Sequence, residues 1–239
     1  MHRNVCALVL ALAICGIVLP AGAEAAKPDT LALTPDAQTA LVVIKTASWK
    51  PAPNMKSAFK LVLSAYDPAA QKIVGGPYSG SVLIEARERN FAEGYLLAPI
   101  KPGRWVVQSY SQQDLWALCF NAASLQFDVK PGEVVYLGDF DALAHRRQLI
   151  ERTVRTGKTS LRGVAFADFF DLPDSPRFAP VDGGQLDAVR EMLGRQAPLV
   201  TAPVRAVEFA PAQFGTGSTL FAERKCGGYF AVGAKAKSE

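Results

Sequence analysis

Short segments in which apolar and polar side chains alternate at every second position constrain this chain more than any other feature of its sequence. Residues 59–65, 82–87, 104–108 and 125–129 follow this pattern, and residues 40–45 form an apolar, β-branched run. A period of two puts one set of side chains on a buried face and the other in water, which is typical of antiparallel strands. The chain is therefore predicted to be mainly β.

Two Lys-Pro-Gly turns connect these segments and lead directly into the strands that follow. Pro102 and Pro131 fix φ at the first central position of a type II turn, and Gly103 and Gly132 accept the positive φ of the second. Regularly spaced short strands with such turns favour a sandwich. Residues 134–137 are apolar on both faces, which predicts a central strand.

Two stretches resemble a known type of β-sandwich. Residues 95–105, Tyr-Leu-Leu-Ala-Pro-Ile-Lys-Pro-Gly-Arg-Trp, are similar to the strand entry of transthyretin-like, carboxypeptidase-regulatory-like modules. Residues 127–138 resemble a strand pair of uncharacterised exported bacterial proteins of that type. The resemblance covers roughly residues 38–141 and implies a prealbumin-like, antiparallel β-sandwich that serves as a non-catalytic envelope or accessory module. A likeness in fold does not by itself give a function.

The first 23 residues contain the parts of a cleavable secretory signal peptide. Arg3 supplies the positive charge, residues 5–19 are apolar, and Ala21-Gly22-Ala23 forms a small-x-small cleavage site. The apolar run is short for a helix that crosses ~30 Å of hydrocarbon, which argues against an uncleaved anchor. A lipoprotein would need a small residue before Cys15, where Ile14 stands. We expect a periplasmic or extracellular protein with no transmembrane anchor after cleavage.

Composition narrows the chemistry of the mature chain. Cleavage removes one arginine and no acidic residue, so the formal charge falls from +4 to +3, and a dedicated nucleic-acid binder would be more basic. His145 is the one histidine left, and it is predicted to be solvated within a charged segment, residues 141–158. A Ser-His-Asp or Cys-His arrangement would have to use this residue, and a zinc site would need several histidine or cysteine ligands. We expect no metal and no cofactor.

The mature chain keeps two cysteines, Cys119 and Cys226. Because export favours oxidation, a disulfide between them is predicted. The bridge requires their Cα atoms to come within about 7 Å of each other. The alternative is two unpaired cysteines.

One domain is expected over residues 38–230, between a flexible leader at 24–37 and a disordered tail at 231–239. Residues 141–158 are compatible with either a short helix or an exposed loop. Further strands are expected within residues 161–170 and 204–209.

The clearest helix is predicted at residues 183–194. Asp182 is a good N-cap, and Gln185 completes a capping box three residues later. Gly194 suits the position just after the helix. The apolar stripe that should pack on the sandwich consists of Leu186, Val189 and Leu193.

Acidic and aromatic residues supply the candidate sites. Asp139, Asp141, Asp168 and Asp171 follow or flank predicted strands, and converging carboxylates can bind Ca²⁺ or act as a glycosidase pair. The favoured interpretation is that they cap turns. Phe169 and Phe170 are adjacent in a strand, so one of them is a candidate for exposed contact. With Trp49, Tyr110 and Trp116 they are also candidates for a stacking platform, although strand aromatics more often belong to a core.

These features favour an exported, non-catalytic envelope protein, a binding or structural module whose partner is an unknown envelope protein or a glycan. The alternative is an extracytoplasmic hydrolase that acts on glycan or peptide through carboxylates. The hydrolase would need Asp139 or Asp141 close to Asp168 or Asp171, with the pKa of one of them raised by burial.

Overall fold

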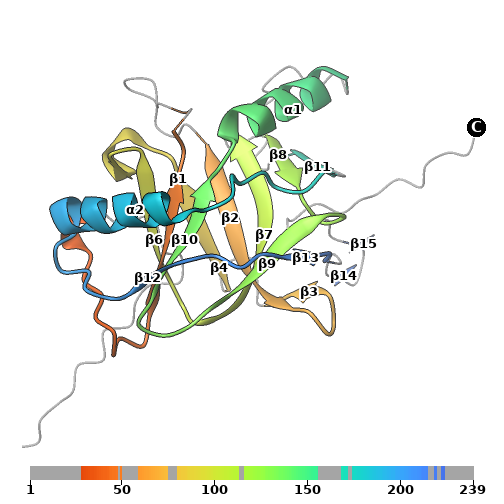
Figure 1. Cartoon of the computed structure of the whole chain (residues 1–239). Helices are drawn as coiled ribbons and strands as arrows, with labels where there is room; N and C mark the ends of the chain where they lie inside the picture. The colour runs from red at the N-terminus through yellow and green to blue at the C-terminus, as the bar shows by residue number, and fades with distance from the viewer. Residues whose placement is uncertain are drawn as a thin grey trace, which may run out of the picture.

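Two β-sheets face each other across an apolar core, and helix α2 covers the outer face of the smaller sheet (Figure 1). The structure is a computed structural model. The side chains of Arg89 and of the strands at 168–171, 218–219 and 222–223 are not described. The residues that the structure describes are 28–47, 49, 59–74, 80–112, 116–155, 168–171, 174–214, 218–219 and 222–223.

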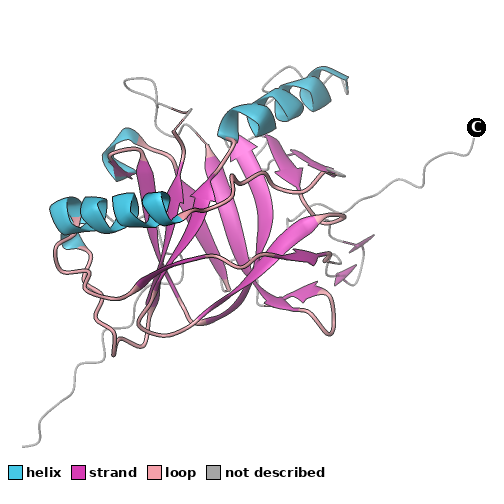
Figure 2. Cartoon of the chain, in the orientation of Figure 1, coloured by secondary structure: helices cyan, strands magenta, loops and turns pink. Residues whose placement is uncertain are grey.

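Strands outnumber helices throughout the described chain (Figure 2). The helices are η1 (Pro28–Thr30), η2 (Glu88–Asn90), α1 (Ala142–Arg155) and α2 (Gly183–Gln196). The strands are β1 (Ala40–Lys45), β2 (Lys60–Asp67), β3 (Lys72–Ile73), β4 (Ser81–Glu85), β5 (Phe91–Ala92), β6 (Tyr95–Ile100), β7 (Gly103–Gln112), β8 (Trp116–Cys119), β9 (Ser124–Val129), β10 (Val134–Asp139), β11 (Asp168–Asp171), β12 (Val204–Ala206), β13 (Ala210–Ala212), β14 (Ser218–Thr219) and β15 (Ala222–Glu223).

The smaller sheet has the order β12-β10-β1-β6-β5. β10 is a central strand, as its apolar sequence predicted. β1 runs antiparallel to β6 but parallel to β10, and β10 runs parallel to β12. The prediction of a purely antiparallel sandwich is therefore wrong here. Parallel strands are usually covered on both faces, and β1 and β10 are buried along nearly their whole length.

The larger sheet has the order β11-β8-β7-β2-β3, with β4 also paired to β2 and β9 paired to both β7 and β13. β7 is long enough for two neighbours on one edge. β9 pairs with its first half, where Gly103 lies opposite Val129, and β8 pairs with its second half. β11 runs parallel to β8. The broad prediction of a mainly β chain with two sheets and packed helices is confirmed.

The core between the two sheets follows the period-two pattern of the sequence. Leu61 and Leu63 of β2 are fully buried, whereas the intervening Val62 is only half-buried. Ala40, Val42 and Ile44 of β1 point into the same core from the other sheet. Each such aliphatic side chain contributes on the order of 1.5–3 kcal/mol when it is fully buried.

Helix α2 packs on the opposite face of the smaller sheet through Val189, Met192 and Leu193. The predicted capping box is present: the Asp182 carboxylate accepts from the backbone N–H of Gln185 at 2.8 Å, and the Gln185 side chain accepts from the backbone N–H of Asp182 at 2.8 Å. These two bonds satisfy donors that the first helical turn otherwise leaves unpaired.

The helix predicted over residues 183–194 continues to Gln196, so Gly194 lies inside α2 and not just after it. Arg195 binds the Glu93 carboxylate through two hydrogen bonds of 3.1 and 2.7 Å, and Gln196 donates to the same carboxylate at 3.1 Å. These contacts hold the last turn against the β5–β6 connection. The hydrogen bond from Arg195 also lowers the pKa of Glu93.

Residues 28–37 belong to the folded body, so the prediction of a flexible leader over 24–37 is wrong for that part. Leu31 and Leu33 are buried beside α2. The backbone N–H of Leu33 donates to Leu199 at 3.1 Å. Leu31 and Leu33 thus anchor a segment whose sequence shows neither the periodicity of a helix nor that of a strand. Residues 1–27 and 224–239, which include the predicted signal peptide and tail, lie outside the described residues.

Helix α1 occupies most of the charged segment for which the sequence left a helix and a loop open. The Asp141 carboxylate accepts from the backbone N–H of Ala144 at 2.9 Å, which stabilises the first turn. Within the described part of the chain, no helix combines the length and the apolar composition that spanning a membrane requires.

Candidate functional site

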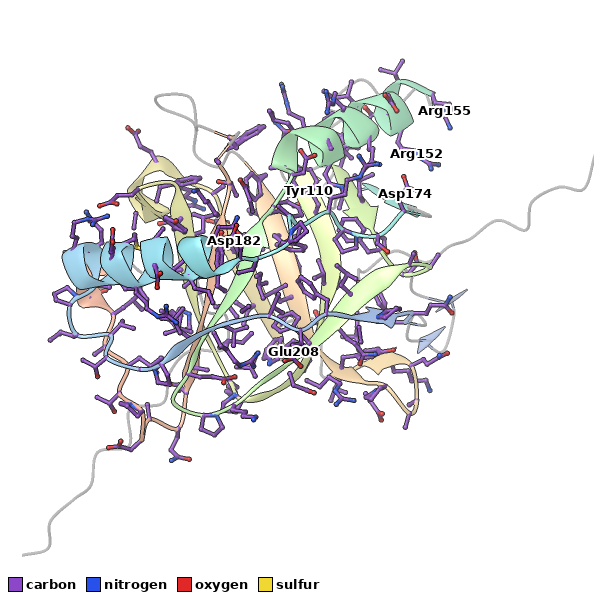
Figure 3. All side chains as sticks on the ribbon, in the orientation of Figure 1. Tyr110, Arg152, Arg155, Asp174, Asp182 and Glu208 are labelled. Atoms are coloured by element: carbon purple, nitrogen blue, oxygen red, sulfur yellow. The ribbon has the colours of Figure 1, made fainter. Side chains whose placement is uncertain are left out.

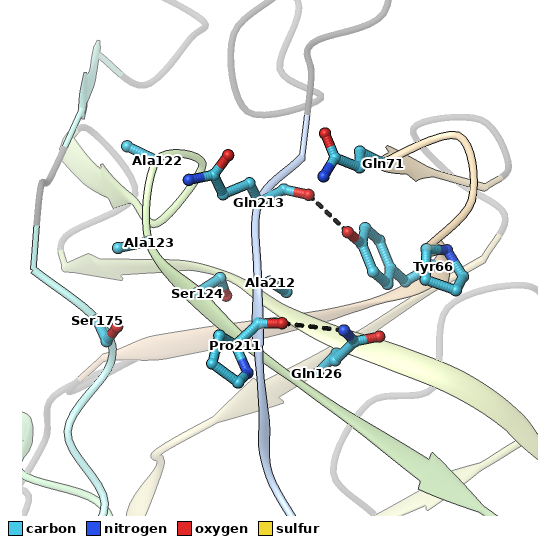
Figure 4. A pocket seen from close by; sticks show the side chains of 11 residues that line it. Tyr66, Gln71, Ala122, Ala123, Ser124, Gln126, Ser175, Pro211, Ala212 and Gln213 are labelled. Atoms are coloured by element: carbon cyan, nitrogen blue, oxygen red, sulfur yellow. Dashed lines mark hydrogen bonds between the residues drawn. The ribbon is translucent and has the colours of Figure 1, made fainter.

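A pocket of about 320 Å³ lies at one end of the larger sheet, where β13 pairs with β9 (Figure 4). Its volume is at the lower end of the range for small-molecule sites. The walls come from the turn after β2, from the β8–β9 connection, from β9 and from β13. The lining residues are Tyr66, Pro68, Gln71, Ala122, Ala123, Ser124, Gln126, Ser175, Pro211, Ala212 and Gln213.

The described lining combines polar side chains with alanines and prolines and carries no formal charge. Glutamine amides and serine hydroxyls supply both donors and acceptors, and the ring of Tyr66 supplies an aromatic wall. Burial raises the pKa of the Tyr66 phenol, so this group stays protonated at neutral pH. A pocket of this composition suits a small neutral ligand with several hydroxyl or amide groups.

Two hydrogen bonds fix the wall that β13 provides (Figure 4). The Tyr66 hydroxyl donates to the carbonyl of Gln213 at 2.6 Å, and the Gln126 amide donates to the carbonyl of Pro211 at 3.0 Å. The Gln126 side-chain oxygen is buried and has no hydrogen-bond partner among the described residues. Because the backbone of β13 is held at both ends, the pocket is built before any ligand arrives.

Other side chains of the pocket are not committed to neighbours. Among the described residues, the amides of Gln71 and Gln213 and the hydroxyl of Ser175 make no hydrogen bond. Gln71 is held at the rim by an unusual backbone with φ of 50°, in the turn where the Asp67 carboxylate accepts from Ala69 and Ala70. The three uncommitted side chains are the groups most available to a ligand.

Sequence reasoning missed this pocket because its parts are far apart and individually ordinary. Gln126 was correctly placed on the polar face of its strand. Ala210-Pro211-Ala212 gave no strand signal, since proline removes a donor, but an edge strand tolerates it. No local pattern shows that this segment pairs with β9.

The predicted acidic residues divide into two groups. Asp139 accepts from the backbone N–H of Ala47 at 3.1 Å, and Asp141 caps α1, so both carboxylates stabilise backbone as the favoured interpretation expected. For Asp168 and Asp171 the structure describes only the backbone of β11. Among the described residues, no group of three or more histidine, cysteine or acidic side chains is placed to hold a metal ion.

The aromatic platform is wrong for two of its members, because Tyr110 is fully buried and Trp49 is 8% exposed. Both pack on Phe59 in the core, with ring centroids 5.6 and 5.7 Å away. Trp116 is half-buried. The side chains of Phe169 and Phe170 lie outside what the structure describes, so their exposure stays a prediction.

His145 is fully buried, so the prediction of a solvated histidine is wrong. Tyr110 lies beneath the start of α1 (Figure 3), and its ring faces His145. The imidazole stacks on Phe140 with centroids 5.1 Å apart and meets Phe120 edge-on. The sequence did not indicate this burial, because arginines follow His145 directly and the other residues on the buried face of α1 are mostly small.

The hydrogen bonds of His145 fix its tautomer. The backbone N–H of Arg177 donates to Nε2 at 3.0 Å, so Nδ1 carries the proton and bonds to the side-chain oxygen of Gln148 at 2.9 Å. Burial lowers the pKa of His145 to about 4, and the positive charge of Arg177 adds to this effect. The ring joins α1 to the segment that carries Ser175, but it does not line the pocket.

Cys119 is buried on the outer face of the larger sheet, against Tyr66, Val106 and Phe214. Its predicted partner Cys226 lies outside the described residues, so the disulfide stays a prediction.

Comparisons with known proteins leave the chain without an assigned relative: no protein-family model, no curated protein and no solved structure matches it.

Proposed function

We propose that this protein is an exported, non-catalytic binding module, built as a transthyretin-like sandwich, whose pocket holds a small neutral polar ligand. A sugar unit of an envelope glycan is the ligand class that fits best. The observation that carries the proposal is the pocket's described lining, in which amides and hydroxyls surround one aromatic ring without a charged group. Sugar hydroxyls need paired donors and acceptors, and the face of a sugar ring packs on an aromatic side chain.

The described lining favours binding over hydrolysis. Carboxylate-dependent hydrolysis needs an acid and a base on either side of the scissile bond. Asp139 and Asp141 bond to backbone groups elsewhere, and the one titratable lining group, Tyr66, has a raised pKa. The pocket therefore supplies recognition without a described proton-transfer pair.

Replacing Gln213 by alanine is expected to weaken sugar binding about two- to tenfold. A neutral hydrogen bond contributes roughly 0.5–1.5 kcal/mol, and about 1.4 kcal/mol corresponds to a factor of ten in affinity. Titration calorimetry and saturation-transfer NMR with neutral sugars, N-acetylglucosamine and its dimer among them, would measure the change. Glucuronate and glucosamine serve as charged counterparts.

Gln38→Ala is the matched control, because Gln38 is exposed and far from the described lining. It should bind as the unaltered protein does. Binding of only the charged sugars, or equal affinities of the Gln213→Ala and Gln38→Ala proteins, would contradict the proposed site.

The proposed cleavage of the signal peptide and the proposed disulfide both change the mass of the intact protein. Protein recovered from the producing cells should begin at Glu24 and weigh two hydrogen atoms less than the reduced chain. Phe214 packs beside Cys119, and about a dozen positions separate it from Cys226 in the sequence. Mass spectrometry before and after reduction checks both points. A chain that begins at Met1, or two cysteines alkylated without reduction, would refute the corresponding part.

A further inference from the structure

Helix α1 exposes a face that the pocket does not use. Its buried side consists of Ala142, Ala144, His145, Leu149 and Thr153. Ile150 and Val154 point to the other side and are 47% and 62% exposed. They lie four residues apart, so they are neighbours on the helix surface. Exposed large aliphatic side chains in adjacent turns are costly to keep in water unless something covers them.

Arginines surround this apolar pair. Arg146, Arg147, Arg152 and Arg155 stand against the single acid Glu151, which gives α1 a net charge of +3 within a chain whose formal charge is +4. Arg147 shares the exposed face with the apolar pair, and Arg155 flanks it at the end of the helix. Among the described residues neither Arg147 nor Arg155 forms an ion pair.

The helix dipole explains only part of this composition. Arg152 and Arg155 stand in the last turn, where positive charge stabilises the C-terminal end of a helix. Arg147 lies in the first half, where the dipole gives no benefit. Exposure of Ile150 and Val154 does not contribute to the stability of the helix either. A partner surface that carries anions and also covers aliphatic side chains accounts both for Arg147 and for the exposure of Ile150 and Val154.

The shape of α1 favours a flat occupant. α1 rises beyond the ends of the strands (Figure 1), with Arg152 and Arg155 at its far end (Figure 3). The surface is convex, and its apolar members are two aliphatic side chains. The centres of protein interfaces are usually enriched in aromatic residues. Phosphate groups of a bilayer bind arginine in a bidentate way, and aliphatic side chains enter the boundary between headgroups and acyl chains.

We propose that α1 docks this protein on an anionic lipid surface. Ile150 and Val154 enter the headgroup boundary, and Arg147 and Arg155, which precede and follow them along the helix, bind lipid phosphates. The attachment is weak and reversible, since two aliphatic side chains bury little area and each arginine near such a surface contributes only modestly. This role is separate from the pocket, which lies on the larger sheet.

Vesicle sedimentation tests the proposal with the whole chain as purified from cells. The protein should sediment with vesicles of phosphatidylcholine and phosphatidylglycerol at 70:30, but not with phosphatidylcholine alone, and 0.5 M NaCl should release it. The double variant R147Q/R155Q should lower the partition coefficient more than tenfold, at about fivefold per arginine. I150S/V154S should lower it as well.

K101Q/K130Q is the control, because it removes the same charge from exposed positions elsewhere. It should leave binding nearly unchanged. All substitutions are at exposed sites, and circular dichroism with thermal melting verifies that each protein folds. Equal losses in R147Q/R155Q and K101Q/K130Q, no preference for anionic vesicles, or equally tight binding to soluble polyglutamate would overturn the proposal. The last result would assign α1 to an acidic protein partner.

Discussion

Acidification from pH 7 to pH 4 is expected to lower the free energy of unfolding by about 3 kcal/mol through His145 alone. The native imidazole has a pKa of about 4, whereas an unburied histidine has one of 6.5. Below pH 6.5 the unfolded chain therefore binds a proton that the native chain does not. The contribution of His145 to the free energy of unfolding is fully present above about pH 6.5 and is lost progressively as the pH falls towards 4.

The geometry around the ring explains why protonation is resisted. A proton on Nε2 would face the backbone N–H of Arg177, so two donors would meet at 3.0 Å. Arg177 also opposes the positive charge, whereas Asp141 and Asp174 favour it less strongly. Phe120 and Phe140 pack against the imidazole, and the His145 side chain is fully buried, which disfavours its charged form.

Urea denaturation at pH 7, 5.5 and 4 measures this loss, and an NMR titration of the buried histidine measures its pKa directly. The variant His145→Asn should be less stable at pH 7, because it loses aromatic packing, but its stability should change less between pH 6.5 and 4. Carboxylates with lowered pKa, such as Asp128 and Glu133, lose their contribution at lower pH in both proteins. A midpoint at or above pH 6 for the native imidazole would contradict the expectation.

Gly132→Ala is expected to destabilise the protein by about 3–4 kcal/mol. Gly132 has φ of +66°, as its Lys-Pro-Gly turn predicted. An added Cβ would stand 1.8 Å from the carbonyl oxygen of Pro35 and 2.5 Å from its carbonyl carbon. Both are backbone atoms, so the two chains would have to separate. The substitution adds this overlap to the strain of a left-handed backbone.

Two other glycines separate these causes. Gly94 has φ of +88° with nothing near its Cβ position, so Gly94→Ala should cost only about 1–2 kcal/mol of backbone strain. Gly194 lies within α2 with open space around it, so Gly194→Ala should stabilise the protein by about 0.5–1 kcal/mol. Denaturation midpoints at constant slope rank the three variants. Gly132→Ala proving no worse than Gly94→Ala would rule out the predicted overlap.

The sequence predicted those strands and helix ends that are determined by residues close together in the chain. The alternation in β2 and β4 reports one buried face and one polar face, and both strands formed where the pattern lay. Asp182 and Gln185 fixed the start of α2, since a capping box needs only residues three positions apart. The central place of β10 followed from its apolar character on both faces.

The remaining features depend on contacts that no local pattern contains. Leu33 is ordered by residues near Val200, which the segment 28–37 alone does not suggest. His145 is buried because Phe120 and Phe140, which directly follow β8 and β10, both pack against its ring. The pocket likewise needs β13 to pair with β9, more than 80 residues earlier in the chain. For the same reason the sequence singled out aspartates at strand ends rather than the glutamines that line the pocket.

The parallel pairing of β1 with β10 has a consequence for how the chain folds. Leu41 lies opposite Val134, about 90 residues later, and β12 adds to the far edge of β10 only near residue 204. At roughly 5–20 residues per second, a ribosome needs several seconds to make that length. Contacts so distant in sequence also form slowly in the finished chain. The first strand is therefore made seconds before one of its neighbours, and the smaller sheet can close only after β10 and then β12 have been made.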